Sequence, residues 1–272
     1  TRYVGRHSHL TRPVAPGGLY NKGEGIEMAL KIGAAPAGQY DAFHAEPVDP
    51  RSGKPEALVG IFIYGILVNQ KGERFIDEGS NLYELIYEEV SREILEQEGG
   101  LVYFICDSKI EEVPNYARRI KTEKEPIKGK SITELAVKLG IDSTQLERTI
   151  REYNTAVQDG HFDPSVLDGK CTIGIKPPKS NWARSISERD LLAFPVACAN
   201  CFTFGGLKIT PNATVLNQDG YVIPGLFAAG EVIGLYYGSY VGSTSVLRGL
   251  VFGRKAGKHA AAYCKKPQNK GP

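Results

Sequence analysis

The glycine-rich stretch that closes the chain constrains the fold more than any other sequence feature. Residues 226–231 (LFAAGE) predict a short apolar strand that ends in a small-residue turn and a carboxylate. Residues 242–245 (GSTS) then open a predicted helix over 244–263, in which glycines recur at every fourth position. Glycine at that spacing destabilises an isolated helix, so we expect this helix to pack closely against another backbone or a ligand.

These elements suggest a place for an anionic ligand. A carboxylate at the end of a strand lies where α/β sheets bind ligands, and the N-terminus of the following helix favours negative charge. The alternative interpretation is a glycine-rich turn that does no more than cap a core helix. The residues alone leave both interpretations open.

The rest of the chain predicts a mixed α and β protein. Ser131 and Asp142 each begin a capping-box pattern, in which a side chain accepts a hydrogen bond from the first turn of a helix. Residues 163–183 contain three prolines and few apolar side chains, so we expect a long irregular segment there. The remaining expected elements are buried strands at 60–69 and 101–106, a helix over 81–97 and a hairpin turn at 218–220.

Composition excludes several classes of protein. The 33 basic and 31 acidic residues leave a net charge of +2, too balanced for a nucleic-acid-binding surface. No apolar run approaches the roughly 20 residues of a membrane span, and the first residues are too polar for a signal peptide. The five cysteines form no disulfide framework or metal-ligand pattern, because Cys198 and Cys201 have no second pair. We therefore expect a cytoplasmic protein without a metal site.

Several motifs together resemble the fumarate reductase and succinate dehydrogenase flavoprotein superfamily. Residues 206–257 are similar to its C-terminal signature, in which I-P-G-L-[FY]-A-A-G-E precedes a glycine-rich turn and a helix with F-G-R-x-A-G. Residues 20–34 resemble its T-G-D-G-I-x-M-A-x-x-x-G-A motif, and residues 68–78 resemble V-N-x-x-G-x-R-F-x-[ND]-E. Within the superfamily, residues 177–183 and 201–208 look most like the tricarballylate dehydrogenases, which oxidise a tricarboxylic acid to cis-aconitate.

The resemblance implies an FAD-dependent dehydrogenase of a small polycarboxylic acid, with an electron acceptor that the sequence does not identify. It implies an α/β flavin-domain remainder over residues 1–44 and 192–272, with an inserted α+β capping domain over 45–191. The G-x-G-x-x-G segment that opens family members does not occur here, so we expect a C-terminal portion of a longer enzyme. Two alternatives stay open: a dehydrogenase of a ketone or steroid-like substrate, and a non-catalytic fragment that needs a partner to bind FAD.

The resemblance also implies roles for individual residues. Tyr240 and His44 are the candidates for the general base. A polycarboxylate substrate needs cations and hydrogen-bond donors, so the expected substrate-binding residues are Arg248 in the final helix, Arg184 just after residues 181–183, and Thr203. The expected cofactor-binding residues are Gly230, Glu231, Gly242, Ser243, Thr244, Ser245 and Val246.

Three positions depart from the pattern of the fumarate reductases. Leu82 stands where the resemblance implies an arginine proton donor, and Phe202 stands where it implies a histidine. Tyr240 replaces a substrate-binding arginine, whereas ketosteroid dehydrogenases carry a tyrosine there. These departures predict that fumarate reduction is not the reaction. Arg74, by contrast, is expected to have a structural role at a hinge.

Overall fold

The computed structural model describes residues 11–14 and 20–265, which form two compact units. Among the described residues, the first unit comprises 20–44 and 201–265, and the second comprises 11–14 and 45–200. The chain passes between the units after His44 and returns after Asn200. The return lies further along than the boundary at 192 that the sequence suggested, because strand β7 (Leu191–Thr203) runs unbroken out of the sheet of the second unit.

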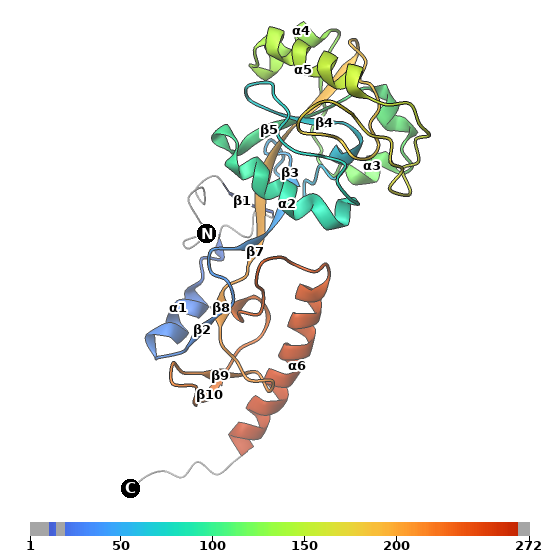
Figure 1. Cartoon of the computed structure of the whole chain (residues 1–272). Helices are drawn as coiled ribbons and strands as arrows, with labels where there is room; N and C mark the ends of the chain where they lie inside the picture. The colour runs from blue at the N-terminus through green and yellow to red at the C-terminus, as the bar shows by residue number, and fades with distance from the viewer. Residues whose placement is uncertain (1–10, 15–19, 266–272) are drawn as a thin grey trace. The chain divides into compact units, whose positions relative to one another are not determined.

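The second unit is built on a six-stranded sheet with the order β1-β7-β5-β4, in which β3 and β6 also pair with β7 (Figure 1). Strands β5 and β6 pair antiparallel with β7, and β4 pairs antiparallel with β5, whereas β1 runs parallel to β7. The other strands of this sheet are β1 (Arg12–Pro13), β3 (Phe43–Val48), β4 (Ile66–Asn69), β5 (Leu101–Cys106) and β6 (Ile127–Gly129). The helices of the unit are α2 (Tyr83–Glu96), α3 (Tyr116–Arg119), α4 (Ile132–Leu139) and α5 (Ser143–Ala156).

Both faces of this sheet are buried. Alternate residues of β4 and β5, such as Leu67 and Phe104, share one cluster with the apolar face of α2. Their neighbours, such as Val68 and Ile105, share a second cluster with α4 and α5. A strand covered on both faces reads as a continuous apolar run, which is why β5 was predictable from its sequence.

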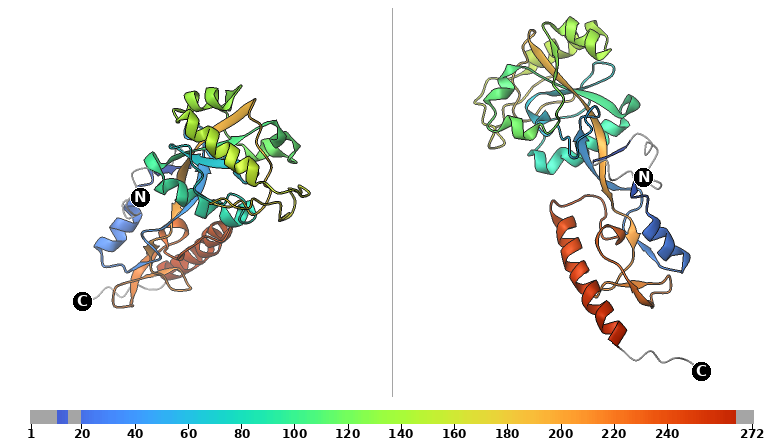
Figure 2. Two further views of the ribbon diagram at one scale, coloured as in Figure 1. Left: turned by 45° about the horizontal axis from the view of Figure 1, so that its top comes forward. Right: turned by 180° about the vertical axis from the view of Figure 1, so that it is seen from behind.

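The first unit contains short strands and one long helix (Figure 2). Strand β2 (Pro36–Ala37) pairs antiparallel with β8 (Gly206–Leu207), and β9 (Thr214–Leu216) pairs antiparallel with β10 (Val222–Phe227). Helix α1 (Glu24–Lys31) packs on a small core with β8, and α6 (Thr244–Lys265) follows the glycine-rich turn. Among the described residues, no helix is both long and apolar enough to cross a membrane.

The helix starts and the hairpin turn follow the sequence. The Ser131 hydroxyl accepts from the Glu134 N–H at 3.1 Å, and the Asp142 carboxylate accepts from the Gln145 N–H at 2.7 Å. The Asn217 carbonyl accepts from the Gly220 N–H at 3.1 Å, which closes the turn between β9 and β10. These local signals were confirmed because each depends on only a few neighbouring residues.

The prediction of a strand over residues 60–69 is wrong for the first half of that range. Residues 62–64 form a 3-10 turn, and only Ile66–Asn69 is extended. Gly65 separates the two parts, and a Cβ added there would lie 2.4 Å from the Ile105 carbonyl oxygen. The backbone therefore approaches β5 at a distance that only glycine allows.

Candidate functional site

Four aromatic rings gather in the first unit. The ring of His44 lies 4.3 Å from that of Tyr240 and 5.1 Å from that of Phe202, measured between centroids. Tyr236 completes the cluster, with its ring 5.6 Å from Tyr240. These side chains come from β3, from β7 and from the loop that precedes α6. The two residues predicted as candidate bases, His44 and Tyr240, are thus in contact.

Arg248 borders this aromatic cluster from the second turn of α6 and is only 5% exposed. Its guanidinium carbon lies 4.7 Å from the ring centroid of Tyr236 and 5.2 Å from that of Phe202. The Ile233 carbonyl accepts a hydrogen bond from Nη1 at 3.1 Å, whereas Nε is buried with no hydrogen-bond partner among the described residues. Burial lowers the pKa of Arg248, but a guanidinium stays charged near neutral pH.

This arrangement holds a positive charge out of water, and no carboxylate among the described residues forms an ion pair with Arg248. A buried charge is costly unless it is paired, and a guanidinium pairs best with a planar anion such as a carboxylate. The site therefore has the chemistry of an anion-binding site.

The turn that opens α6 lies beside the same rings. Thr244 Oγ1 accepts a hydrogen bond from the Tyr236 hydroxyl at 3.0 Å and donates to the Val241 carbonyl at 2.6 Å. The hydroxyls of Tyr240 and Ser245 are hydrogen bonded at 2.9 Å. Side chains on both sides of the turn thus fix the start of the helix.

The backbone of this turn is open on one side. Ser243 has a φ of 67°, a left-handed conformation that is uncommon for a residue other than glycine. A Cβ added at Gly242 would meet no atom within 4 Å, and Val246 in the first turn is 62% exposed. An exposed helix N-terminus of this kind suits a negatively charged ligand group.

Glu231 is held in place by two donors. Its carboxylate accepts from the Asn21 amide at 3.0 Å and from the Thr203 N–H at 3.4 Å. The carboxylate follows Gly230, whose φ of 74° begins a short 3-10 turn. Thr203, predicted to bind substrate, thus lies beside Glu231 and contacts it through its backbone.

Arg184 lies in the second unit, and its guanidinium has partners of its own. Nη1 pairs with the Glu112 carboxylate at 2.8 Å, and Nη2 donates to the Lys109 carbonyl at 2.9 Å. The guanidinium carbon also lies 3.9 Å from the ring centroid of Phe162. These contacts hold the irregular segment after α5 in place and lend no support to a substrate role for Arg184.

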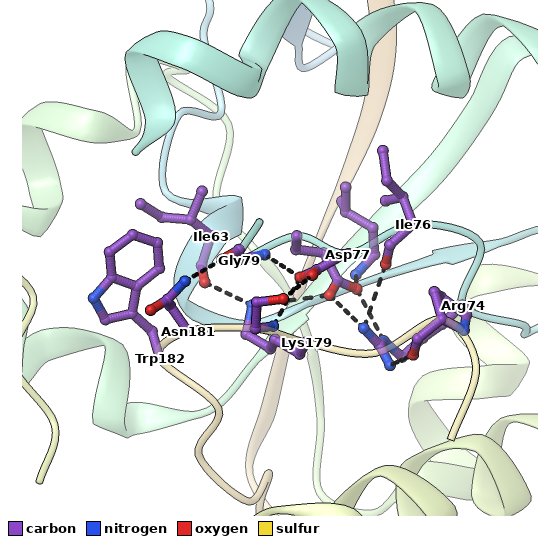
Figure 3. A network of polar contacts seen from close by, with 12 residues as sticks. Ile63, Arg74, Ile76, Asp77, Gly79, Lys179, Asn181 and Trp182 are labelled. Carbon is purple, nitrogen blue, oxygen red and sulfur yellow. Dashed lines mark hydrogen bonds and ion pairs between the residues drawn. The ribbon is translucent and has the colours of Figure 1, made fainter. Parts of the chain in front are cut away.

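A buried ionic network lies in the same unit (Figure 3). Arg74 forms an ion pair with Glu78 at 2.6 Å, and its Nη1 donates to the Pro177 carbonyl at 2.8 Å. Lys179 is fully buried, donates to the Ile63 carbonyl at 2.7 Å and lies 3.8 Å from Glu78. Burial lowers the pKa of Lys179 to about 8. The network ties the 74–78 segment to the irregular segment, which agrees with the structural role expected of Arg74.

Tyr236 and Lys179 are the residues that sequence reasoning missed. Tyr236 follows the 3-10 turn in a run of glycines and aromatic residues, and no spacing pattern separates it from its neighbours. Lys179 sits among polar and proline residues, where a lysine is ordinarily solvated. Only the folded structure shows that both side chains contact charged groups.

Comparison with known proteins places the chain in a family. The family described as FAD binding domain matches residues 5–247. The chain is 33% identical over 249 residues to the NADH:acrylate oxidoreductase of Vibrio harveyi, and this alignment covers 88% of the chain and 23% of that protein. The matching segment is therefore only about a quarter of this relative's length.

Solved structures agree with this placement. The open conformation of a flavocytochrome c3 fumarate reductase has a TM-score of 0.68 and 27% identity, covering 90% of this chain and 40% of that one. The 3-ketosteroid-Δ4-(5α)-dehydrogenase of Rhodococcus jostii RHA1 has a TM-score of 0.60 and 27% identity, covering 88% and 45%. The chain spans less than half the length of each of these proteins. It therefore belongs to the FAD binding domain family, with the mixed sheet-and-helix fold of the fumarate reductase flavoproteins and FAD as its cofactor.

Proposed function

We propose that the chain is part of an FAD-dependent dehydrogenase that desaturates a small carboxylic acid. The observation that carries this proposal is the buried guanidinium of Arg248, which has one backbone acceptor and no carboxylate partner among the described residues. The names of two relatives support it, since acrylate and fumarate are unsaturated carboxylic acids. The resemblance of residues 177–183 and 201–208 narrows the substrate to a polycarboxylic acid, with tricarballylate converted to cis-aconitate.

The first unit fits the cofactor chemically. The open backbone of residues 242–246 and the helix N-terminus would face an anionic or strongly hydrogen-bonding ring edge, as an oxyanion-type site does. The Gly230 carbonyl and the fixed carboxylate of Glu231 would accept hydrogen bonds from hydroxyl groups of the cofactor chain. When bound, FAD supplies a hydride acceptor at flavin N5.

The chain's own residues would bind, orient and deprotonate the substrate. Arg248 would hold a carboxylate, which also increases the acidity of the adjacent C–H. Tyr240 or His44 would accept that proton while the hydride leaves the neighbouring carbon, so that one C=C bond forms and two C–H bonds break. We propose that the second unit is the cap that excludes water during this step.

Dehydrogenation of a ketone or steroid-like substrate is the second candidate. The observation that favours it is the aromatic cluster, because rings such as Phe202 and Tyr240 suit an apolar substrate body. The Tyr240 hydroxyl would then donate a hydrogen bond to the substrate carbonyl. The structural similarity to a ketosteroid dehydrogenase supports this alternative.

Titration of the flavin-loaded protein with tricarballylate tests the first proposal. We expect the absorption band at about 450 nm to fall as the acid binds and is oxidised. Arg248→Lys keeps a charge but lacks the planar fork, so it should weaken binding at least about tenfold. Arg189→Lys, at an exposed position of the second unit, is the matched control and should bind as the wild type does.

Three other outcomes would separate the alternatives. Unchanged affinity in Arg248→Lys would contradict the role of Arg248 in carboxylate binding. Binding of a cyclic ketone in place of the acid would favour the second candidate. A protein that takes up no FAD would indicate a segment that depends on a partner for its cofactor.

A further inference from the structure

Tyr236 contacts both the first residue of α6, Thr244, and Arg248 in its second turn. Its hydroxyl donates to Thr244 Oγ1 at 3.0 Å, and Thr244 is the first residue of the helix. Its ring lies 4.7 Å from the guanidinium carbon of Arg248. Residues four positions apart lie on the same face of a helix, so one side chain spans the first two turns.

Each contact has a distinct physical effect. The hydrogen bond from Tyr236 leaves Thr244 Oγ1 free to donate its own proton to the Val241 carbonyl, which closes the turn. The ring offers its negative π-face to Arg248, and such a cation–π contact is stronger when it is desolvated, as it is here. The ring therefore offsets part of the cost of burying the guanidinium.

The backbone of Tyr236 is also fixed. Its carbonyl accepts a hydrogen bond from the Gln39 N–H at 3.0 Å, and its ring packs against Phe204 at 5.5 Å. Phe204 is fully buried. Tyr236 is thus anchored to the core of the first unit and can transmit that rigidity to α6.

We propose that Tyr236 is a positioning residue that sets the distance between the carboxylate-binding guanidinium of Arg248 and the flavin-facing turn at Thr244. This inference rests on the proposed function. Within the substrate, covalent bonds set the distance between the carboxylate and the reacting C–H. The guanidinium that binds the carboxylate must therefore lie at a matching distance from the flavin edge that receives the hydride. Misplacement by about 1 Å at such a site costs roughly a hundredfold in rate.

Two substitutions separate the two contacts of Tyr236. Tyr236→Phe keeps the ring and removes the hydroxyl, whereas Tyr236→Leu removes both. In the flavin-loaded protein we expect Tyr236→Phe to weaken flavin binding about twofold to tenfold and to lower kcat, with the KM for tricarballylate nearly unchanged. Tyr236→Leu should in addition weaken tricarballylate binding about threefold to thirtyfold.

Tyr221→Phe provides the control, because Tyr221 is a 73% exposed tyrosine of the same unit. It should match the wild type in both dissociation constants and in the unfolding midpoint. Tyr236→Phe should unfold near the wild-type midpoint, so its effects on kcat and flavin affinity would not reflect loss of fold.

Equal losses of flavin and tricarballylate affinity in both variants would overturn the positioning role, as would no loss in either. The Arg248→Lys variant distinguishes a failure of this inference from a failure of the proposed function. If Arg248→Lys leaves tricarballylate affinity unchanged, the carboxylate site itself is contradicted. If Arg248→Lys abolishes binding while both Tyr236 variants behave as the wild type, only the role of Tyr236 is lost.

Discussion

The Tyr240 hydroxyl and the Ser245 Oγ are hydrogen bonded at 2.9 Å, although the two residues lie on opposite sides of the turn that opens α6. The Ser245 N–H also points at the same hydroxyl oxygen, 3.4 Å away. The hydroxyl is therefore fixed by the helix N-terminus rather than left to rotate in solvent. A proton acceptor or donor held in this way is pre-organised for a substrate atom.

Substitution of Tyr240 by phenylalanine tests its catalytic role. We expect kcat to fall about 10²-fold or more, because general acid–base catalysis contributes on that scale, while flavin content stays close to that of the wild type. Steady-state kinetics and the ratio of flavin to protein absorbance measure the two effects. Unchanged turnover would eliminate Tyr240 as base or hydrogen-bond donor.

His44 and Tyr240 should act as a coupled pair. Their rings are 4.3 Å apart, so the effects of His44→Gln and Tyr240→Phe on kcat/KM should not add in the double variant. We expect a coupling energy of about 0.5–3 kcal/mol from the double-mutant cycle. Additive effects would mean that the two side chains serve independent steps.

Lys179 should make the stability of the second unit depend on pH. Its pKa is about 8 in the folded protein and near 10.5 when unfolded, so between these values the unfolded chain binds the extra proton. The free energy of unfolding should therefore rise with pH across this window, by up to about 1.4 kcal/mol per pH unit.

Urea unfolding of the wild type and of Lys179→Met, followed from pH 7.5 to 10, measures this effect. The difference in unfolding free energy between the two proteins should shift in favour of the wild type as the pH rises. A difference that stays constant over this range would show that Lys179 keeps its ordinary affinity for protons.

The N-terminal cap of α5 gives a test of local stability. Asp142→Ala removes the acceptor of the Gln145 N–H, and we expect a loss of about 1 kcal/mol in unfolding free energy. Asp159→Ala changes an exposed aspartate of the same unit and should be neutral within about 0.5 kcal/mol. Equal effects of the two substitutions would indicate that the cap contributes nothing beyond its charge.

Much of the fold was predictable because its signals are local. The caps at Ser131 and Asp142 and the hairpin turn at 218–220 each depend on neighbouring residues. The 3-10 turn at 62–64 was not predictable, because its sequence is as apolar as a buried strand and the close approach of Gly65 to β5 is a tertiary constraint.

Individual residues of the candidate site could be predicted from the sequence, but their contacts with one another could not. The motifs pointed to His44 and Tyr240, and the need for a cation pointed to Arg248; the structure brings all three to one aromatic cluster. The contact of Tyr236 with both Thr244 and Arg248 depends on how the loop folds back over the helix. Arg184 was singled out by its place in a motif, yet the structure engages it with Glu112 and Phe162.

Anaerobic addition of tricarballylate to the flavin-loaded protein is the decisive measurement. We expect the flavin band at about 450 nm to bleach as cis-aconitate forms, and Arg248→Ala to abolish the bleaching while retaining flavin. A band that stays unbleached by tricarballylate but bleaches with a cyclic ketone, equally in the wild type and in Arg248→Ala, would contradict oxidation of a carboxylic acid bound by Arg248.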